Sequence, residues 1–428
     1  MRNNVTPINQ KAIFSSTKLP NFVNIRVEKY YSCRVDNTWG GKHIMRGLVP
    51  SSEALVLTSN DYLGISQHSK IKRAIVHSVE RSGNGLLMSG IFLHGECPQL
   101  KLEEKFARYM RSEASVLCQS GYSANVGLLQ SIANAQTPVY VDMMAHMSLW
   151  EGVKNAGAKP ISFIHNDVDH LERQILRHGT GIVLVDSIYS TSGSMSPLVE
   201  IANICEKLDC VLVVDESHAL GTHGPQGEGL VVALGIENKV QFRTASLAKA
   251  FAGRAGLITC SSRFHEYFKF ESYNAIFSST LLPYEVMGLG ATLEVIKEEG
   301  WRRKQLAKSS AFVRKELTQL GYYLNRSQSQ IISLESGTEE QTIVLRDALE
   351  RQGVFGSVFC APATAKNRSL IRLSLNANLE NKDLNKLVEA CASIRDQVGM
   401  LNWPSTRRGK RRDELTQSEY MVGQEKIA

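Results

Sequence analysis

The chain has none of the features that would place it in a membrane or on a secretory route. No stretch approaches the roughly 20 apolar residues that a spanning helix needs. The first residues, MRNNVTPINQKAIF, hold no apolar segment like the core of a signal peptide. We therefore expect a cytoplasmic protein without a membrane partner.

The sequence also lacks the spacings of metal sites, disulfide frameworks and repeat proteins. Its eight cysteines are scattered, and no two of them form a C-x-x-C pair. This spacing predicts no metal site, and the thiols should stay reduced in the cytoplasm. We find no internal repeat and no low-complexity linker.

What is present is an ordinary globular composition. The 428 residues are 43% hydrophobic and 21% charged, which is enough for one large domain and a smaller one. The formal charge of +7 is modest; it favours phosphate-bearing ligands and does not by itself indicate nucleic acid. Part of that charge lies in RRGKRR, residues 407–412, which we interpret as a solvated end.

Three short β-branched runs each end in an aspartate. They are VYVD, GIVLVD and CVLVVD, ending at Asp142, Asp186 and Asp215. Such near-continuous apolar runs are typical of strands buried on both faces of a parallel sheet. A helical pattern at 198–209 separates the last two, which predicts a β-α-β unit. Ligands of such sheets bind beyond the carboxyl ends of the strands, where the three aspartates should lie.

The pattern changes after about residue 285. Residues 284–321 predict one long helix, and strands at 329–336 and 369–376 alternate with helices at 339–353 and 382–398. The predicted organisation is an N-terminal arm (1–57), a large domain (58–285), a small α/β domain (286–400) and a basic, mobile tail (401–428).

One lysine has unusual neighbours. In RTASLAKAFAGRAG, residues 243–256, Lys249 is surrounded by small and apolar residues. Burial lowers the pKa of a lysine and yields a neutral amine, which can form a Schiff base with an aldehyde. The alternative is a helix N-terminus on the core, with Lys249 extending to water.

The segment VVDESHALGTHG places His218 three residues after Asp215. A D-E-x-H box also occurs in helicases, but those need a phosphate loop G-x-x-x-x-G-K-[ST], which the chain does not contain. The other hypothesis joins Asp215 to Lys249, because pyridoxal phosphate needs a Schiff-base lysine and an anion that keeps its ring nitrogen protonated. The alternative for Asp215 alone is the N-cap of a following helix.

Phosphate-binding candidates accompany this pair. The turn that opens SGYSANVGLLQSI, residues 120–132, offers backbone N–H groups at a helix N-terminus, and Ser246, Ser278 and Ser279 offer hydroxyl groups, although serines at turns are usually caps. His146 is a candidate to stack on the ring, against a purely structural role. Arg372, in an apolar strand, suits a substrate carboxylate or an internal salt bridge.

Together these segments resemble the α-oxoamine synthases. These pyridoxal-phosphate enzymes have the aspartate-aminotransferase fold (fold type I) and join an amino acid to an acyl-CoA. The resemblance runs from TSNDYLG (58–64) to IRLSLNAN (371–378), through SGYSANVGLLQ, AHMSLWEG, VVDESHALGTHGPQGEG, SLAKAFAGRAG and FSSTLLP. It implies an α/β fold: a large, mostly parallel sheet with helices on both faces, and a smaller C-terminal α/β domain.

The resemblance also implies a role for each matching residue. Lys249 corresponds to the Schiff-base lysine, Asp215 to the partner of the pyridine nitrogen and His146 to the stacking histidine. The remaining positions match the phenolic-oxygen neighbours (His218, Ser190), the phosphate site (Ser246 with the backbone of Gly121 and Tyr122, and Ser279 from the partner subunit of a homodimer) and the carboxylate binders (Arg372, Asn60).

One branch matches more closely. VYVDMMAHMSLWEGVKNAGA, DSIYSTSGSMSPL, AIFSSTLLPYE and GVFGSVFCAPATAKNRSLIRLSLN are similar to the autoinducer synthases of the cholera-autoinducer and α-hydroxyketone type. Those enzymes make a quorum-sensing ketone precursor from a medium-chain acyl-CoA and S-adenosylmethionine or 2-aminobutyrate.

Where relatives that use glycine or alanine carry a G-S/T-R turn, this chain has GNGLLMSGIFLHGECPQLKLEE. This departure favours a larger amino donor, with the acyl chain on Leu86, Met88, Ile91 or Phe92. The alternatives are another α-oxoamine synthase, such as 8-amino-7-oxononanoate synthase, a plain aminotransferase, and a cofactor-binding regulator without catalysis.

Overall fold

The computed structural model describes residues 18–324 and 326–409, and it divides into a short unit ending at Gly47 and a large unit beginning at Leu48. The short unit contains the helix α1 (Asn21–Tyr30) and the π-helical turn η1 (Tyr31–Thr38). The large unit carries every predicted site residue. The domain boundaries predicted at 57, 285 and 400 stay predictions.

The large unit is built around a seven-stranded sheet. Its strands are β2 (Ala114–Cys118), β3 (Val139–Asp142), β4 (Pro160–Phe163), β5 (Ile182–Asp186), β6 (Val211–Asp215), β7 (Phe242–Ser246) and β8 (Gly256–Cys260). Their order is β2-β8-β7-β6-β5-β3-β4. Only the pairings of β8 with β7 and β2 are antiparallel, so the mostly parallel sheet is confirmed.

Helices cover both faces of this sheet. α4 (Gly121–Ile132) and α5 (Met147–Asn155) contact each other, as do α6 (Val168–His178) and α7 (Leu198–Lys207). Right-handed β-α-β crossovers place the two pairs on opposite faces. The other helices of this part are α2 (Ser69–Ser82), η2 (Gly90–Phe92), α3 (Pro98–Tyr109), α8 (Leu230–Ala233), η3 (Glu237–Lys239), α9 (Ser262–Glu271) and α10 (Tyr273–Ile276).

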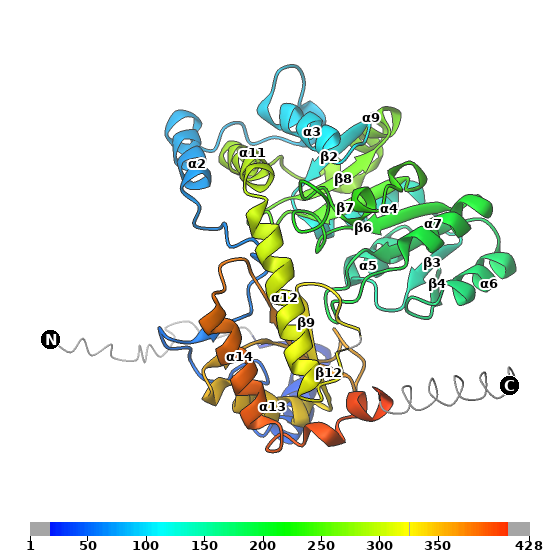
Figure 1. Cartoon of the computed structure of the whole chain (residues 1–428). Helices are drawn as coiled ribbons and strands as arrows, with labels where there is room; N and C mark the ends of the chain where they lie inside the picture. Colours follow the sequence, from blue (N-terminus) through cyan, green and yellow to red (C-terminus); the bar gives the residue numbers. More distant parts are fainter. Residues whose placement is uncertain (1–17, 325, 410–428) are drawn as a thin grey trace, which may run out of the picture. The chain divides into compact units, whose positions relative to one another are not determined.

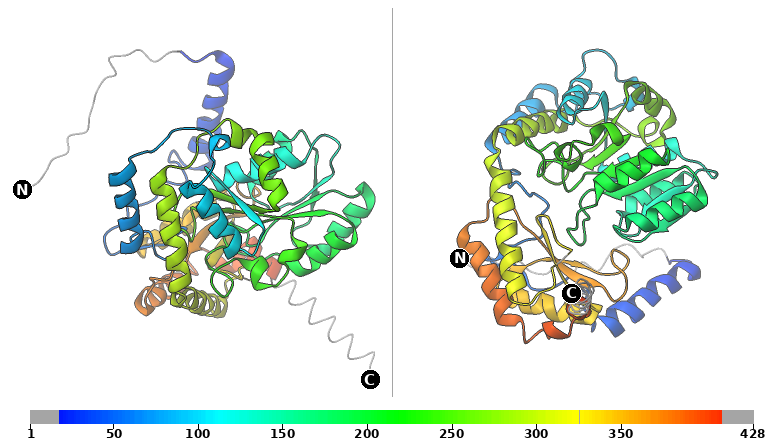
Figure 2. Two further views of the ribbon diagram at one scale, coloured as in Figure 1. Left: turned by 90° about the horizontal axis from the view of Figure 1, so that it is seen from above. Right: turned by 45° about the vertical axis from the view of Figure 1, so that its right-hand side comes forward.

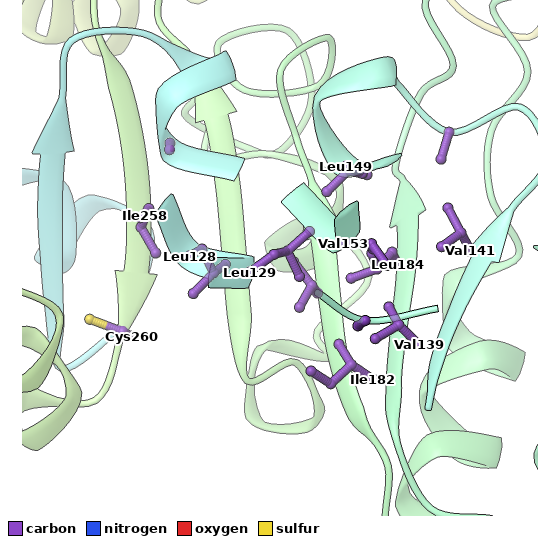
Figure 3. Close-up of a cluster of buried hydrophobic side chains, with 14 of the residues drawn as sticks. Leu128, Leu129, Val139, Val141, Leu149, Val153, Ile182, Leu184, Ile258 and Cys260 are labelled. Atoms are coloured by element: carbon purple, nitrogen blue, oxygen red, sulfur yellow. The ribbon is translucent and has the colours of Figure 1, made fainter. Parts of the chain in front are cut away.

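The core between the sheet and the α4–α5 pair is apolar and closely packed (Figure 3). Leu128 and Leu129 of α4 meet Leu149 and Val153 of α5 there, and all four side chains are fully buried. This packing fixes α4 and α5 against the strands. The N-termini of both helices are therefore held at defined places near the strand ends.

A second α/β part follows, and the helix α12 (Trp301–Gln319) leads into it (Figures 1 and 2). Its antiparallel sheet has the order β11 (Ser357–Phe359), β12 (Ser369–Ser374) and β9 (Ile331–Gly337). Its helices are α13 (Glu339–Arg351), α14 (Asn381–Ile394) and η4 (Met400–Asn402). A separate parallel pair joins β1 (Leu55–Val56) to β10 (Val354–Phe355).

The single long helix predicted for 284–321 is wrong. The structure has two helices, α11 (Pro283–Glu298) and α12 (Trp301–Gln319). Glu299 leaves the helical region, with φ −101° and ψ 52°, and Gly300 follows it, which has a low helix propensity. The Glu299 carboxylate instead binds Arg302 at 2.7 Å and His68 at 3.0 Å.

The start of the predicted mobile tail is part of the packed structure. Trp403 is 2% exposed, and its indole N–H donates to the carbonyl of Val398. Arg408 forms an ion pair with Glu335. The rest of the predicted tail, residues 410–428, lies outside the described residues.

Candidate active site

The three aspartates predicted at strand ends lie there, and all three are buried. Asp186 and Asp215 are register partners across β5 and β6. The N-cap alternative for Asp215 is wrong, because a turn follows β6 and the next helix begins only at Leu230. The Asp215 carboxylate accepts hydrogen bonds from the backbone of Ser217 and the side chain of Asn125.

Lys249 lies in the turn that joins β7 to the antiparallel β8, so the helix alternative for this segment is wrong. The side chain is half-buried, and among the described residues its ammonium has no hydrogen-bond or ion-pair partner. Burial lowers the pKa of Lys249, the charge of Arg372 lowers it further and Asp215 opposes the shift. The result is an amine that loses its proton more readily than an ordinary lysine.

The N-terminus of α4 closes directly onto Ser246. A Cβ atom on Gly121 would lie 2.6 Å from the Cβ of Ser246, so only glycine permits this approach. The N-cap Ser120 binds the N–H of Ser123, whereas the N–H groups of Gly121 and Tyr122 donate to no other described residue. Free N–H groups at a helix N-terminus beside a serine form a suitable site for phosphate.

A chain of hydrogen bonds links Asp215 to His146. Asn125 of α4 donates from Nδ2 to the Asp215 carboxylate at 2.7 Å and to the Ser148 hydroxyl at 2.8 Å. The Ser148 hydroxyl lies 2.8 Å from Nδ1 of His146, the N-cap residue of α5. Asn125 lies in SGYSANVGLLQ and Ser148 in AHMSLWEG, but neither was predicted as a site residue.

A second chain of hydrogen bonds surrounds Arg372. Its guanidinium donates to the Asn60 side chain at 2.8 Å and to the Ser190 carbonyl at 3.0 Å, and it stacks on Phe359. Tyr62, which the sequence analysis also missed, donates to Asn60 and lies 2.7 Å from Nδ1 of His218.

The salt-bridge alternative for Arg372 is wrong within the described residues. Arg372 is 5% exposed, it pairs with no described carboxylate, and its Nε finds no described partner. Burial lowers the pKa of this guanidinium. A cation buried without an anion is costly, which suits a site that receives a carboxylate from a ligand.

The pKa values of both histidines of the site are lowered, which favours their neutral forms. Desolvation lowers the pKa of His146, and Lys249 adds to this shift while Asp215 opposes it. Burial takes the pKa of His218 well below its usual range, and the charges of Lys249, Arg372 and His146 act in the same direction. A neutral imidazole has one N–H donor and one acceptor nitrogen, so each ring suits hydrogen bonding to a reacting group.

A cavity of about 840 Å³ adjoins this cluster at His146 and Ser190. Its walls are mainly apolar and include Met143, Met144, Met147, Trp150, Phe359 and Leu370. Arg326, Arg368 and Arg408 also line it, and Glu335 is the one carboxylate among its lining residues. Leu86, Met88, Ile91 and Phe92, where we expected the acyl chain, are absent from its walls. Apolar walls and an excess of positive charge suit an apolar ligand that carries phosphate.

Ser279 is exposed, and its carbonyl accepts a hydrogen bond from the side chain of Gln119 in the same chain. Its predicted contact with a partner subunit therefore stays a prediction. Within residues 18–324 and 326–409, no cluster of three or more His, Cys, Asp or Glu side chains suits a metal ion. None of the helices in that part of the chain is both long and apolar enough to cross a membrane.

The fold and this cluster are those of a pyridoxal-phosphate enzyme of fold type I. Residues 52–391 match the family model for aminotransferase class I and II. The chain belongs to this family. Within it, the chain is an enzyme of the α-oxoamine synthase type, as its relatives indicate.

Among curated relatives, the CAI-1 autoinducer synthase of Vibrio campbellii is 44% identical over 373 residues, which cover 87% of this chain and 95% of the relative. An 8-amino-7-oxononanoate synthase of Lysinibacillus sphaericus is 27% identical over 350 residues, 81% of this chain and 90% of the relative. The predicted resemblance to the α-oxoamine synthases and their autoinducer branch is confirmed.

Solved structures share the fold. A serine palmitoyltransferase from S. paucimobilis, with a bound PLP–myriocin aldimine, superposes with a TM-score of 0.79 at 21% identity, covering 88% of this chain and 98% of that one. An 8-amino-7-oxononanoate synthase from Francisella tularensis gives a TM-score of 0.72 at 22% identity, covering 81% and 99%. The predicted fold class is confirmed.

Proposed function

We propose that the chain joins an acyl-CoA to an amino donor with loss of CoA and carbon dioxide, making the aminoketone precursor of an α-hydroxyketone quorum-sensing autoinducer. The donor is S-adenosylmethionine or 2-aminobutyrate, and the acyl group is medium-chain. The similarity to the CAI-1 autoinducer synthase over 87% of the chain carries this proposal. The arginine-lined cavity beside His146 supports an acyl-CoA substrate.

The residues of the site fit pyridoxal phosphate. Lys249 has no described partner, the N–H groups of Gly121 and Tyr122 are free, and Arg372 is buried without a carboxylate. When bound, the cofactor supplies an aldehyde that takes up amines and a ring that accepts negative charge from the substrate α-carbon. Polar groups that lack partners and lie around one site are the groups that a bound ligand would satisfy.

The roles proposed for the residues that would hold the cofactor rest on the resemblance to the α-oxoamine synthases. Lys249 would bind the aldehyde covalently, and Asp215 would keep the ring nitrogen protonated. The N–H groups of Gly121 and Tyr122, with Ser246, would hold the phosphate. His146 would stack on the ring, His218 and Ser190 would adjoin its phenolic oxygen, and Ser279 would reach the phosphate from the partner subunit.

The remaining roles concern the substrates. Arg372, oriented by Asn60, binds the donor carboxylate through its planar fork. Lys249 would also act as the base that removes the proton from the donor α-carbon, which its lowered pKa favours. His146 or His218 donates a hydrogen bond to the thioester oxygen as the carbon–carbon bond forms. Loss of CoA and then of carbon dioxide would complete the condensation; with S-adenosylmethionine as donor, the sulfonium side chain would also be eliminated as a neutral thioether, giving an enaminone.

We also propose a homodimer with shared active sites. Large apolar side chains are exposed on two neighbouring segments, the η2 region and the α9–α10 region; they are Leu86, Leu87, Phe92, Phe270, Tyr273 and Phe277. A backbone bridge between Ser89 and Ser279 joins these segments. Clustered exposed apolar side chains are typical of interfaces, and a second copy covering them would meet Ser279.

Incubating the purified holoenzyme with mixed acyl-CoAs and amino donors tests the function directly. We expect one thiol of free CoA for each aminoketone formed, with mass spectrometry identifying the preferred chain and donor. The family match also favours a plain aminotransferase. Keto-acid-dependent amine transfer without thiol release would establish that alternative and contradict the proposal.

The cavity gives a second test. Arg326 is exposed on its lining and has no described ion-pair partner. We expect Arg326→Gln to raise KM for acyl-CoA about tenfold, since one charged hydrogen bond to phosphate contributes about 1.5–3 kcal/mol. With a truncated acyl thioester that lacks the nucleotide, the variant and the parent should have the same KM. Arg173→Gln, an exposed arginine of α6, is the control; an equal rise of KM for the truncated thioester would contradict the phosphate contact.

A further inference from the structure

The hydrogen bonds that connect Asp215 to His146 have a defined direction. A carboxylate only accepts hydrogen bonds, so the atom of Asn125 that faces Asp215 at 2.7 Å is its amide nitrogen. The Asn125 oxygen accordingly accepts from the Thr244 hydroxyl at 2.6 Å. The contacts with Asp215 and Thr244 are therefore both satisfied by one orientation of the Asn125 side-chain amide.

The second N–H of Asn125 fixes Ser148. It donates to the Ser148 hydroxyl at 2.8 Å, so the Ser148 hydrogen must point elsewhere. Ser148 is fully buried, and Nδ1 of His146, at 2.8 Å, is the other described group within reach of its hydroxyl. The Ser148 hydroxyl therefore donates to His146.

Nδ1 of His146 accordingly acts as an acceptor. The backbone N–H of Ser148 also points at this nitrogen, at 3.3 Å. A hydrogen on Nδ1 would face this N–H and would leave the buried Ser148 hydroxyl without an acceptor. Asp215 and Lys249 are the charged groups that act on the ring, with opposite effects, and the Asp186 carboxylate binds the His146 backbone N–H at 3.1 Å. A neutral ring with a bare Nδ1 carries its proton on Nε2.

We propose that Asn125 and Ser148 are positioning residues, which transmit the orientation set by Asp215 and hold the His146 ring with its proton on Nε2. His146 then serves as the hydrogen-bond donor to the thioester oxygen of the acyl donor. This second part rests on the proposed function. The proposal thereby assigns the hydrogen bond to the thioester oxygen to His146 and not to His218.

The tautomer is measurable without turnover. In holoenzyme carrying ¹⁵N-labelled histidine, two-bond ¹H–¹⁵N correlations distinguish a protonated from a bare ring nitrogen, and the His146→Gln variant assigns the signal. At pH 7.5 we expect a protonated Nε2 and a bare Nδ1. A protonated Nδ1, or a doubly protonated ring, would overturn the proposal whatever the enzyme makes.

Ser148→Ala tests the transmission. We expect a mixture of both tautomers in its spectrum, and a kcat/KM for acyl-CoA about tenfold lower, as for the loss of one orienting hydrogen bond. Exchange of the donor α-proton with solvent, which needs no acyl-CoA, should change less than about twofold. Ser131→Ala removes another buried hydroxyl of the same region, bound only to the Leu128 carbonyl, and should leave all three readouts unchanged.

The outcomes separate the two proposals. A parental tautomer in Ser148→Ala, or equal losses in α-proton exchange and in kcat/KM, would contradict the positioning role. Absence of thiol release from the parent enzyme would contradict the proposed function and leave the tautomer result standing.

Discussion

Replacing Lys249 with alanine should remove the visible absorption band of the bound cofactor and lower turnover at least about 10³-fold, the scale on which a positioned proton-transfer group contributes. The half-buried amine has no described partner, and its pKa is lowered by burial and by Arg372. Among the described residues, Lys249 is the only lysine that we assign to the site. Absorption spectra and thiol release measure the two effects.

Borohydride reduction of the resting enzyme provides the matching chemical test. Peptide mapping should find the reduced cofactor on Lys249 and nowhere else. Lys72→Ala, which removes an exposed lysine of α2, serves as the control and should keep both the band and the label. A label on another lysine, or a band that persists in Lys249→Ala, would rule out the assignment.

Asp215→Asn should slow exchange of the donor α-proton about 10²- to 10³-fold while cofactor is still bound. The substitution keeps the shape of the side chain and removes the negative charge that would hold the ring nitrogen protonated, so an electrostatic contribution of this size is lost. Mass spectrometry of the donor in D₂O follows the exchange.

The matched control is the Asp186→Asn substitution, at the end of the neighbouring strand β5. Asp186 is the register partner of Asp215, and burial together with the charge of Asp215 takes its pKa well above the usual range. An amide keeps the size of this side chain and the oxygen that accepts from the His146 backbone N–H, so Asp186→Asn should slow exchange by no more than about threefold. Equal effects of the two substitutions would remove the special role of Asp215.

Three of the seven strands of the large sheet, β3, β5 and β6, were predictable because burial on both faces leaves a clear apolar pattern. Residues 139–142, 182–186 and 211–215 follow it, and each ends in its aspartate. The turn at Lys249 was not predictable in this way. The small residues of this turn show neither helical nor strand periodicity. The close approach of α4 to Ser246, which Gly121 permits, restricts the path of the turn, and this contact is not visible in the local sequence.

The site residues that were not predicted from the sequence were missed for one physical reason. Asn125 and Ser148 lie inside helices, where nothing in their local pattern shows which distant group they meet. Their partner Asp215 is 90 positions away from Asn125. Similarly, Tyr62 meets His218 across 156 positions. A polar residue inside an apolar helix indicates a buried hydrogen-bond network, but it does not show which other residues form that network.

The groups that we assign to the cofactor come from the start of α4, the start of α5, the end of β6 and the β7–β8 turn. A molecule held by all of them binds only the folded chain, so each increment of its concentration stabilises that chain by mass action. Withdrawal of pyridoxal phosphate should therefore lower the stability of the fold as well as the activity.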